Sequence, residues 1–173
     1  MRPLFLLIIF LFNIQNSLAQ EEYPKPTAKD VIFYIQHNRG KNTFIYQPNF
    51  ITKGILDDEN PIVARRQLFD NNGEIEPLSS IQRRYAYGIK SKKIAVNIFD
   101  IRLVSYPDQQ LILKVNQNKQ AYIETIINGK FMILKRLFIH QKKGTSGLKT
   151  KVDYITFFGI DKNGKEIQEK LIP

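Results

Sequence analysis

The residues best suited to ligand binding are arginines and tyrosines in and around one short segment. Guanidinium groups hold phosphate or carboxylate through paired hydrogen bonds, and tyrosine rings stack on sugars or cover acyl chains. We propose that these residues form a binding surface for an anionic or lipidic ligand. The set comprises Arg65, Arg66, Arg83, Arg84, Tyr85 and Tyr87. The alternative is structural: the two tyrosines pack the segment onto a sheet, and the arginines are hydrated.

A second chemistry open to this chain is glycan hydrolysis, which needs two carboxyl groups about 5 to 10 Å apart around the sugar. Four acids are candidates for the pair: Glu74, Glu76, Asp100 and Glu124. Glu74 and Glu76 share one face of an extended segment, and the other two lie among apolar neighbours. Surface acids that balance the basic residues produce the same pattern, so an envelope glycan hydrolase is the alternative function.

Other catalytic chemistries lack the residues that they need. The chain has no cysteine, its two histidines are His37 and His140, and no serine lies in a Gly-x-Ser-x-Gly elbow. The histidines also lack the spacing of a zinc site, and the acidic run 57–59 lacks the alternation of a calcium loop. We therefore assign no catalytic or metal-binding residue and expect no cofactor.

The elements that position these residues follow from the spacing of apolar side chains. From residue 94 onward the apolar period is two, which is typical of β-strands. Six strands are predicted there, over residues 94–105, 110–115, 120–127, 131–140, 151–160 and 165–171. Asn128-Gly129 between two of them indicates a two-residue hairpin turn. Crossover helices are missing, so we predict a mainly β fold: an antiparallel β-meander closed as a small barrel or a two-layer sandwich.

The N-terminal half predicts fewer strands. Residues 30–36 and 42–47 form a predicted hairpin, because both are β-branched and aromatic and a short polar turn joins them. Residues 48–60 are predicted to be a loop, and residues 62–69 a third strand.

One short α-helix is predicted at about residues 80–87. Ser79 and Gln82 have the spacing of a capping box, and Gly88 stands where a left-handed terminating residue is expected. Leu78, Ile81 and Tyr85 form the face predicted to pack.

Two predicted strands, 131–140 and 151–160, are apolar on both faces. In the first, strict alternation places Phe131, Ile133, Leu137 and Ile139 on one side and Met132, Leu134 and Phe138 on the other. Strands of this kind are covered on both faces. We expect the helix or the N-terminal hairpin to cover the outside of this part of the sheet.

The first residues have the pattern of a secretory signal peptide. Arg2 precedes an apolar run over residues 4–12, and Ser17-Leu18-Ala19 fits a cleavage site. We predict a signal peptide over 1–19, a flexible segment over 20–29 and a single β-rich domain over 30–173, with the mature protein periplasmic or secreted. The apolar run is too short to span a bilayer, and no transmembrane segment is expected in the mature chain.

The chain of 173 residues has a formal net charge of +10. Such a charge attracts anionic partners such as envelope lipid or polysaccharide, and export argues against nucleic acid. The first hypothesis is therefore a non-catalytic binding or structural module of the cell envelope. A third hypothesis is an accessory subunit that uses the two-sided apolar strands as an interface. The sequence leaves the oligomeric state open.

Several segments resemble a bacterial exported family known as domain of unknown function 4833. They are Val31-Ile32-Phe33-Tyr34-Ile35-Gln36, Asn60-Pro61, the segment from Leu78 to Gly88, and Phe157-Phe158-Gly159-Ile160-Asp161 followed by Gly164-Lys165-Glu166. Ala86-Tyr87-Gly88 is the most specific part. This chain has Ala64-Arg65-Arg66-Gln67 where the family is associated with aromatic residues including tryptophan. The resemblance implies an exported single domain and supplies no activity.

Overall fold

The computed structural model describes residues 23–173 and consists mainly of β-strands. The strands are β1 (Phe33–His37), β2 (Gly40–Pro48), β3 (Phe50–Thr52), β4 (Ile55–Leu56), β5 (Ile62–Leu68), β6 (Glu74–Pro77), β7 (Ile89–Ala95), β8 (Ile98–Leu103), β9 (Tyr106–Val115), β10 (Ala121–Ile127), β11 (Lys130–Gln141), β12 (Val152–Ile160) and β13 (Glu166–Leu171). One short helix, α1 (Ser80–Tyr85), and two 3-10 turns, η1 (Phe69–Asn71) and η2 (Gly147–Lys149), join them. The predicted signal peptide and the cleavage site after Ala19 lie outside the described residues.

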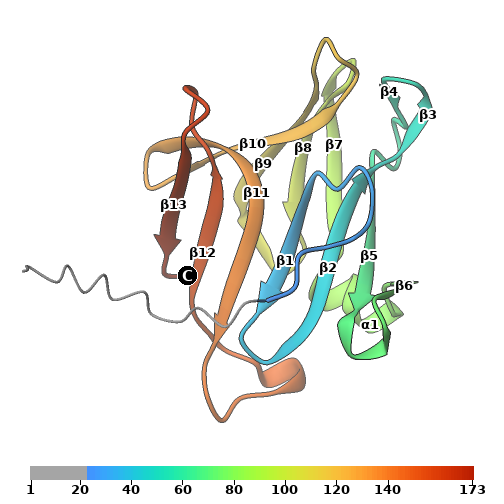
Figure 1. The fold of residues 1–173 in the computed structure, drawn as a ribbon. Coiled ribbons are helices and arrows are strands. Elements are labelled where there is room, and N and C mark those ends of the chain that lie inside the picture. Colours follow the sequence, from blue (N-terminus) through green and yellow to red (C-terminus); the bar gives the residue numbers. More distant parts are fainter. Residues whose placement is uncertain (1–22) are drawn as a thin grey trace, which may run out of the picture.

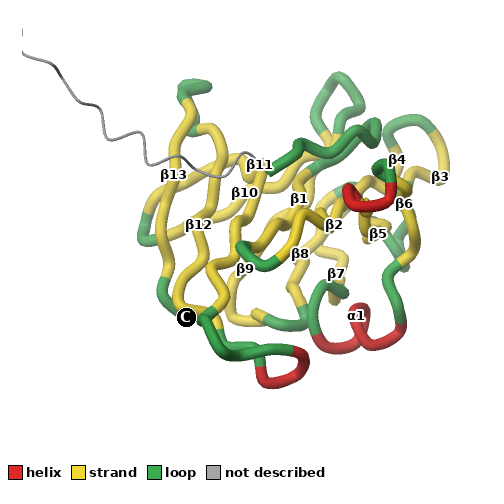
Figure 2. Tube along the Cα trace, turned by 60° about the horizontal axis from the view of Figure 1, so that its bottom comes forward, coloured by secondary structure: helices red, strands yellow, loops and turns green. Residues whose placement is uncertain are grey.

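The main sheet branches at β11. Its first residues pair with β10, its later residues pair with β1, and β12 pairs along most of β11, with β13 on the far side of β12. One branch continues as β1-β2-β5-β6 and the other as β10-β9-β8-β7, while β3 and β4 form a separate hairpin. The sheet thus curls into a half-barrel (Figures 1 and 2), which confirms the predicted class of fold.

One strand pair departs from the predicted antiparallel meander. β1 and β11 are parallel, with Tyr34 opposite Arg136 and His37 opposite Ile139. The hairpin constraint that makes neighbouring strands antiparallel does not act between strands so distant in the chain, and the elements between them serve as the crossover.

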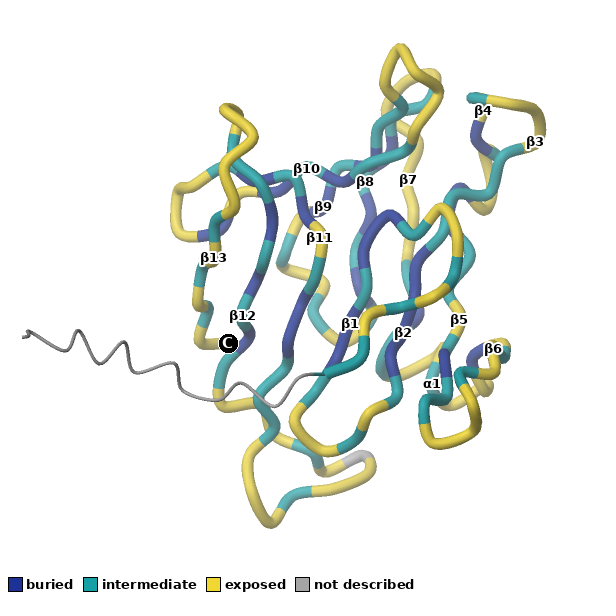
Figure 3. The backbone as a smooth tube through the Cα atoms, in the orientation of Figure 1, coloured by how far each residue is buried: buried dark blue, intermediate teal, exposed yellow. Residues whose placement is uncertain are grey.

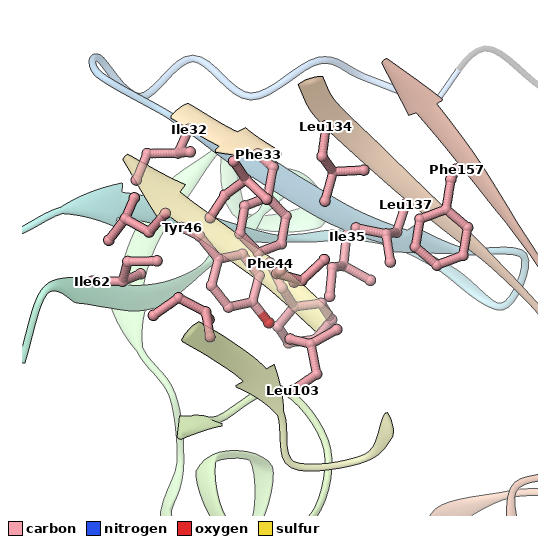
Figure 4. Close-up of a cluster of buried hydrophobic side chains, with 14 of the residues drawn as sticks. Ile32, Phe33, Ile35, Phe44, Tyr46, Ile62, Leu103, Leu134, Leu137 and Phe157 are labelled. Carbon is pink, nitrogen blue, oxygen red and sulfur yellow. The ribbon is translucent and has the colours of Figure 1, made fainter. Parts of the chain in front are cut away.

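The apolar core lies between the two branches. Phe33 and Tyr46 stack with their ring centroids 4.3 Å apart, and Leu103 approaches them from β8 (Figure 4). The hydroxyl of Tyr46 donates a hydrogen bond to the backbone oxygen of Tyr87, so this buried polar group is satisfied. Burial runs along the middle of β1, β2 and β11, and the turns are exposed (Figure 3).

The helix starts as predicted but packs differently. The Ser79–Gln82 capping box is present. Of the predicted packing face, Leu78 is buried, whereas Ile81 and Tyr85 are exposed and no residue of α1 is buried, so the prediction is wrong for the two helical residues. The chain is anchored instead on either side of α1, by Leu78 and Tyr87.

Gly88 also has a different role from the one predicted. It is not among the residues with positive φ. A Cβ atom at this position would lie 1.8 Å from the backbone oxygen of Arg83, so glycine is required by close approach of the backbone.

The segment predicted as a single strand over 94–105 contains a turn. Asn97 adopts φ 58°, and its side chain accepts a hydrogen bond from the Leu56 backbone N–H (3.0 Å) and donates one to the Gly54 carbonyl (2.9 Å). These bonds to the β3–β4 hairpin stabilise a turn that local alternation does not reveal. The Asn128-Gly129 turn is confirmed, since both residues have positive φ.

Residues 23–29, here called the N-terminal strap, cover part of the outer face of the sheet (Figure 1). The ring of Tyr23 meets that of Phe138 edge-on, with centroids 4.7 Å apart. The side chain of Gln36 donates to the Pro24 carbonyl at 2.8 Å. The expected cover, helix or N-terminal hairpin, is therefore wrong, because β1 and β2 belong to the sheet itself and a segment predicted to be flexible packs across them.

In the part of the chain that the structure describes, no helix combines the length and apolar character needed to cross a bilayer.

Candidate functional site

The six residues proposed from the sequence do not form one surface. Arg66 pairs with Glu76 at 2.5 Å, and Arg65, its neighbour on β5, is exposed on the opposite face of that strand. Tyr87 stacks on Phe44 with centroids 3.3 Å apart, and burial raises its pKa to about 12. Tyr87 is thus a packing residue, as the structural alternative stated.

The remaining three residues lie on α1 and are exposed. The guanidinium of Arg84 lies 5.8 Å from the ring centroid of Tyr85, and Arg83 is in the same helical turn. These side chains face solvent on a helix that buries none of its residues. They remain accessible to a ligand, and they line neither of the two grooves described below.

The four candidate acids do not meet in a common groove: of the four, Glu124 alone lines the two grooves described below. Asp100 accepts hydrogen bonds from Arg102, and these lower the pKa of its carboxyl. Glu124 pairs with Lys114 at 2.6 Å and lines two open grooves of about 350 and 590 Å³, which Glu74, Glu76 and Asp100 do not line. A general acid needs a raised pKa, and the shift at Asp100 has the opposite sign.

A different cluster emerges on the outer face of β1, β11, β12 and β13. Strand register places Tyr34 beside Arg136, Arg136 beside Phe158, His140 beside Tyr154, and Thr156 between Phe138 and Lys170. We call this the cationic–aromatic face and define it by Tyr34, Arg136, Phe138, His140, Tyr154, Phe158 and Lys170.

Arg136 lies at the centre of this face. Its guanidinium carbon is 5.0 Å from the ring centroid of Phe138 and 4.9 Å from that of Phe158. Its Nε is buried without a hydrogen-bond partner, and none of the ion pairs within residues 23–173 includes it. Burial lowers the pKa of the guanidinium, although it stays protonated at neutral pH. The side chain is therefore a cation held by aromatic rings, and among the described residues no carboxylate forms an ion pair with it.

His140 and Lys170 extend the positive charge along the face. The ring of His140 stacks on Tyr154 at 3.9 Å, and Lys170 Nζ lies 3.7 Å from the centroid of the same ring. Burial lowers the pKa of His140, and the charges of Lys170 and Arg136 lower it further, while Asp153 acts in the opposite direction. The electrostatic potential at this face is therefore positive and unfavourable to one more cation.

The groups on this face are of the kinds that suit an anion. Arginine can present paired donors to a carboxylate or a phosphate, lysine adds a point charge, and the rings offer flat apolar area. Nothing on the face provides an activated nucleophile. Within residues 23–173, no group of three or more histidine, aspartate or glutamate side chains is placed to hold a metal ion.

Sequence reasoning missed this face because of a β-bulge. The pairing of β11 with β12 shifts register between Leu134 and Arg136. Met132, Leu134, Leu137 and Ile139 consequently all belong to the core, which contradicts the predicted division of this strand. A bulge reverses the faces beyond it, and strict alternation therefore assigned Leu137 and Ile139 to the wrong side. The available signal was a charged pair, Lys135-Arg136, inside an otherwise apolar strand.

Comparison with known proteins identifies a family and no closer relative. No curated protein and no solved structure matches the chain. The model of one family, described as a domain of unknown function, DUF4833, matches residues 33–170. The matched region runs from the start of β1 to the last residue but one of β13, so it includes every residue of the cationic–aromatic face, and the N-terminal strap precedes it. The chain therefore belongs to the domain of unknown function 4833 family.

Proposed function

We propose that this protein is a non-catalytic binding module of the cell envelope whose cationic–aromatic face recognises an anionic polysaccharide. The observation that carries the proposal is Arg136, a half-buried cation between Phe138 and Phe158 with an unpartnered Nε. Burying a charge without an ionic partner disfavours folding, and a ligand anion would supply the missing partner.

The shape of the face favours a sugar polymer. Tyr34 on β1 and Tyr154 and Phe158 on β12 are half-buried, and they flank Arg136 on β11, which lies between those two strands. Flat rings suit the apolar faces of sugar rings, and the cations suit the carboxylates or phosphates that an acidic polymer repeats along its length.

Export supports an envelope location. The signal peptide pattern over 1–19 would deliver the chain to the periplasm or the exterior, where acidic polysaccharides occur. Removal of residues 1–19 takes away Arg2 and lowers the formal net charge from +10 to +9, and this charge adds long-range attraction to such polymers.

The test is binding of the mature chain to polygalacturonate, with neutral dextran as the reference polymer. We expect the Arg136→Gln, Lys170→Gln variant to bind polygalacturonate about tenfold more weakly, because two of the charges that face the polymer are removed. The matched control is Lys143→Gln, Lys165→Gln, which removes two exposed lysines from turns. Equal loss in both variants would show that only net charge matters, and equal binding of dextran would show that the charges do not contribute; either result would refute the site.

A further inference from the structure

Three turns meet at one end of the molecule, at the upper right of Figure 1. They are the β3–β4 turn, the β7–β8 turn and the β9–β10 turn. Asn97 of the second bonds the backbone of the first at Gly54 and Leu56. Lys119 of the third packs against Gly54, where a Cβ atom would lie 2.8 Å from the lysine side chain. We call residues 51–55, 94–97 and 116–119 the three-turn end.

The three-turn end exposes apolar side chains to an unusual degree. Ile51 is 64% exposed, Ile55 48%, Ile94 57% and Val96 76%. All four are β-branched and lie on hairpins that the Asn97 hydrogen bonds hold together. Scattered single apolar residues are ordinary on a surface, whereas several on adjoining tips indicate a contact site.

The charge around these tips is positive. Lys53 and Lys119 lie in the turns, and the turns contain no carboxylate. The acidic run nearest in sequence, 57–59, follows β4, and its Asp58 is paired with Lys93 at 2.5 Å. Apolar tips with lysines beside them match the boundary between acyl chains and anionic headgroups.

We propose that the three-turn end docks on an anionic lipid bilayer, with Ile51 and Val96 entering the acyl boundary and Lys53 and Lys119 contacting headgroups. A bilayer is favoured over a protein partner because the exposed side chains sit on protruding tips, which a deformable interface accepts without a matching pocket. The lysine stems are long enough to follow the tips while their ammonium groups stay at the headgroups. This inference uses none of the residues of the cationic–aromatic face and stands independently of the polysaccharide proposal.

The experiment is sedimentation of the mature protein with vesicles of phosphatidylglycerol and phosphatidylcholine, compared with pure phosphatidylcholine. We expect binding to the anionic vesicles and a decrease of about tenfold in Ile51→Ser, Val96→Ser, because apolar burial is lost. Lys53→Glu should weaken binding at low salt. The matched control is Ile81→Ser, Ile172→Ser, which removes side chains that are 63% and 74% exposed elsewhere. Equal loss in the control would overturn the proposal.

A fluorescent reporter separates insertion from simple charge attraction. The chain contains no tryptophan, so Val96→Trp introduces the sole indole. Its emission should shift to the blue with anionic vesicles, whereas that of Ile172→Trp should not. An unchanged spectrum at position 96 would overturn docking through this end, as would vesicle binding that depends on Arg136 and not on Ile51 and Val96. A blue shift that appears without vesicles as protein concentration rises would assign the tips to a second copy of the chain instead.

Discussion

Arg136 is expected to lower the stability of the fold and to raise the affinity for an anionic ligand. A methionine in its place keeps the apolar contact with Phe138 and Phe158 but removes a half-buried charge that has no carboxylate partner among the described residues. We expect Arg136→Met to leave the free energy of unfolding unchanged or to raise it by up to about 1 kcal/mol, and to weaken polygalacturonate binding about tenfold. Urea unfolding and binding isotherms measure the two effects, with exposed Lys135→Met as the control. A loss of stability in Arg136→Met alone would assign Arg136 a structural role.

His140 should make ligand binding depend on pH. Burial, Lys170 and Arg136 lower its pKa below 6.5 in the free protein, so neutral imidazole is favoured and stability falls as the pH drops from 6.5 through the lowered pKa. A bound anion offsets the two cations and raises that pKa, so binding takes up a proton. Affinity for polygalacturonate should therefore rise, by roughly threefold, between pH 7 and pH 5. His140→Asn should remove the rise, and an unchanged pH profile in that variant would exclude His140 as its source.

The raised pKa of Tyr87 predicts that the protein loses stability at alkaline pH. Its phenol has a pKa of about 12 in the folded protein against 10.0 for an unperturbed tyrosine, and the cause is burial. As pH rises above 10, the unfolded chain loses the proton first, so stability decreases until the pH reaches about 12. The decrease attributable to Tyr87 is about 2 to 3 kcal/mol. Urea unfolding of wild type and Tyr87→Phe at pH 9 and near pH 12 would measure it, and the two proteins should differ in slope. Parallel behaviour would show that other groups, such as buried Tyr46, dominate.

At the scale of elements, the turn after α1 depends on the absence of a side chain at Gly88. A Cβ there would lie 1.8 Å from the Arg83 oxygen, so backbone must move. We expect Gly88→Ala to lower the free energy of unfolding by about 3 kcal/mol. The control is Gly144→Ala, where φ is 79° and no atom lies within 4 Å of the added Cβ; strain alone should cost about 1 kcal/mol. Equal effects in thermal or urea unfolding would contradict steric exclusion as the reason for Gly88.

Elements governed by local rules could be predicted from the sequence. The Asn128-Gly129 turn requires positive φ at both residues, and the Ser79–Gln82 box satisfies the first N–H groups of a helix, so neighbouring residues suffice to specify them. The turn at Asn97 could not be foreseen, because its hydrogen bonds reach a hairpin about forty residues earlier. The same limit applies to the parallel pairing of β1 with β11.

The candidate site was less predictable than the fold. Its residues come from four strands, and only their register brings Tyr34 and Lys170 onto the same surface as Arg136. The bulge beside Arg136 also reverses which residues of β11 face the core, and a prediction from strict alternation of apolar residues does not detect this reversal. The arginines and tyrosines near α1 were conspicuous because they are close in sequence, whereas β5 directs Arg65 and Arg66 to opposite faces.

For the whole molecule, the branched sheet leaves an outer surface at β1 and β11 that needs its own cover. The sequence predicted such a cover from two-sided apolar strands, and the strap supplies part of it. Across the sheet, the Thr27 N–H donates to Gln67 of β5 at 3.1 Å, and Gln47 of β2 donates to the Lys29 carbonyl at 2.8 Å. The strap thus connects strands of one branch with β11, through Tyr23 and Phe138.

Removal of the strap should therefore destabilise the whole domain. A chain that starts at Asp30 loses the cover of Phe138 and leaves Gln36 and Gln67, which are 1% and 0% exposed, without partners in the strap. One lost aromatic contact and two impaired buried amides predict a decrease of about 3 kcal/mol in the free energy of unfolding. Urea unfolding gives this value, and hydrogen exchange should show faster exchange in β1 and β11 than in β8 and β9. The control chain starts at Tyr23 and retains the strap. If both chains unfold at the same denaturant concentration, the strap does not contribute to the free energy of unfolding, and the two branches of the sheet account for the stability.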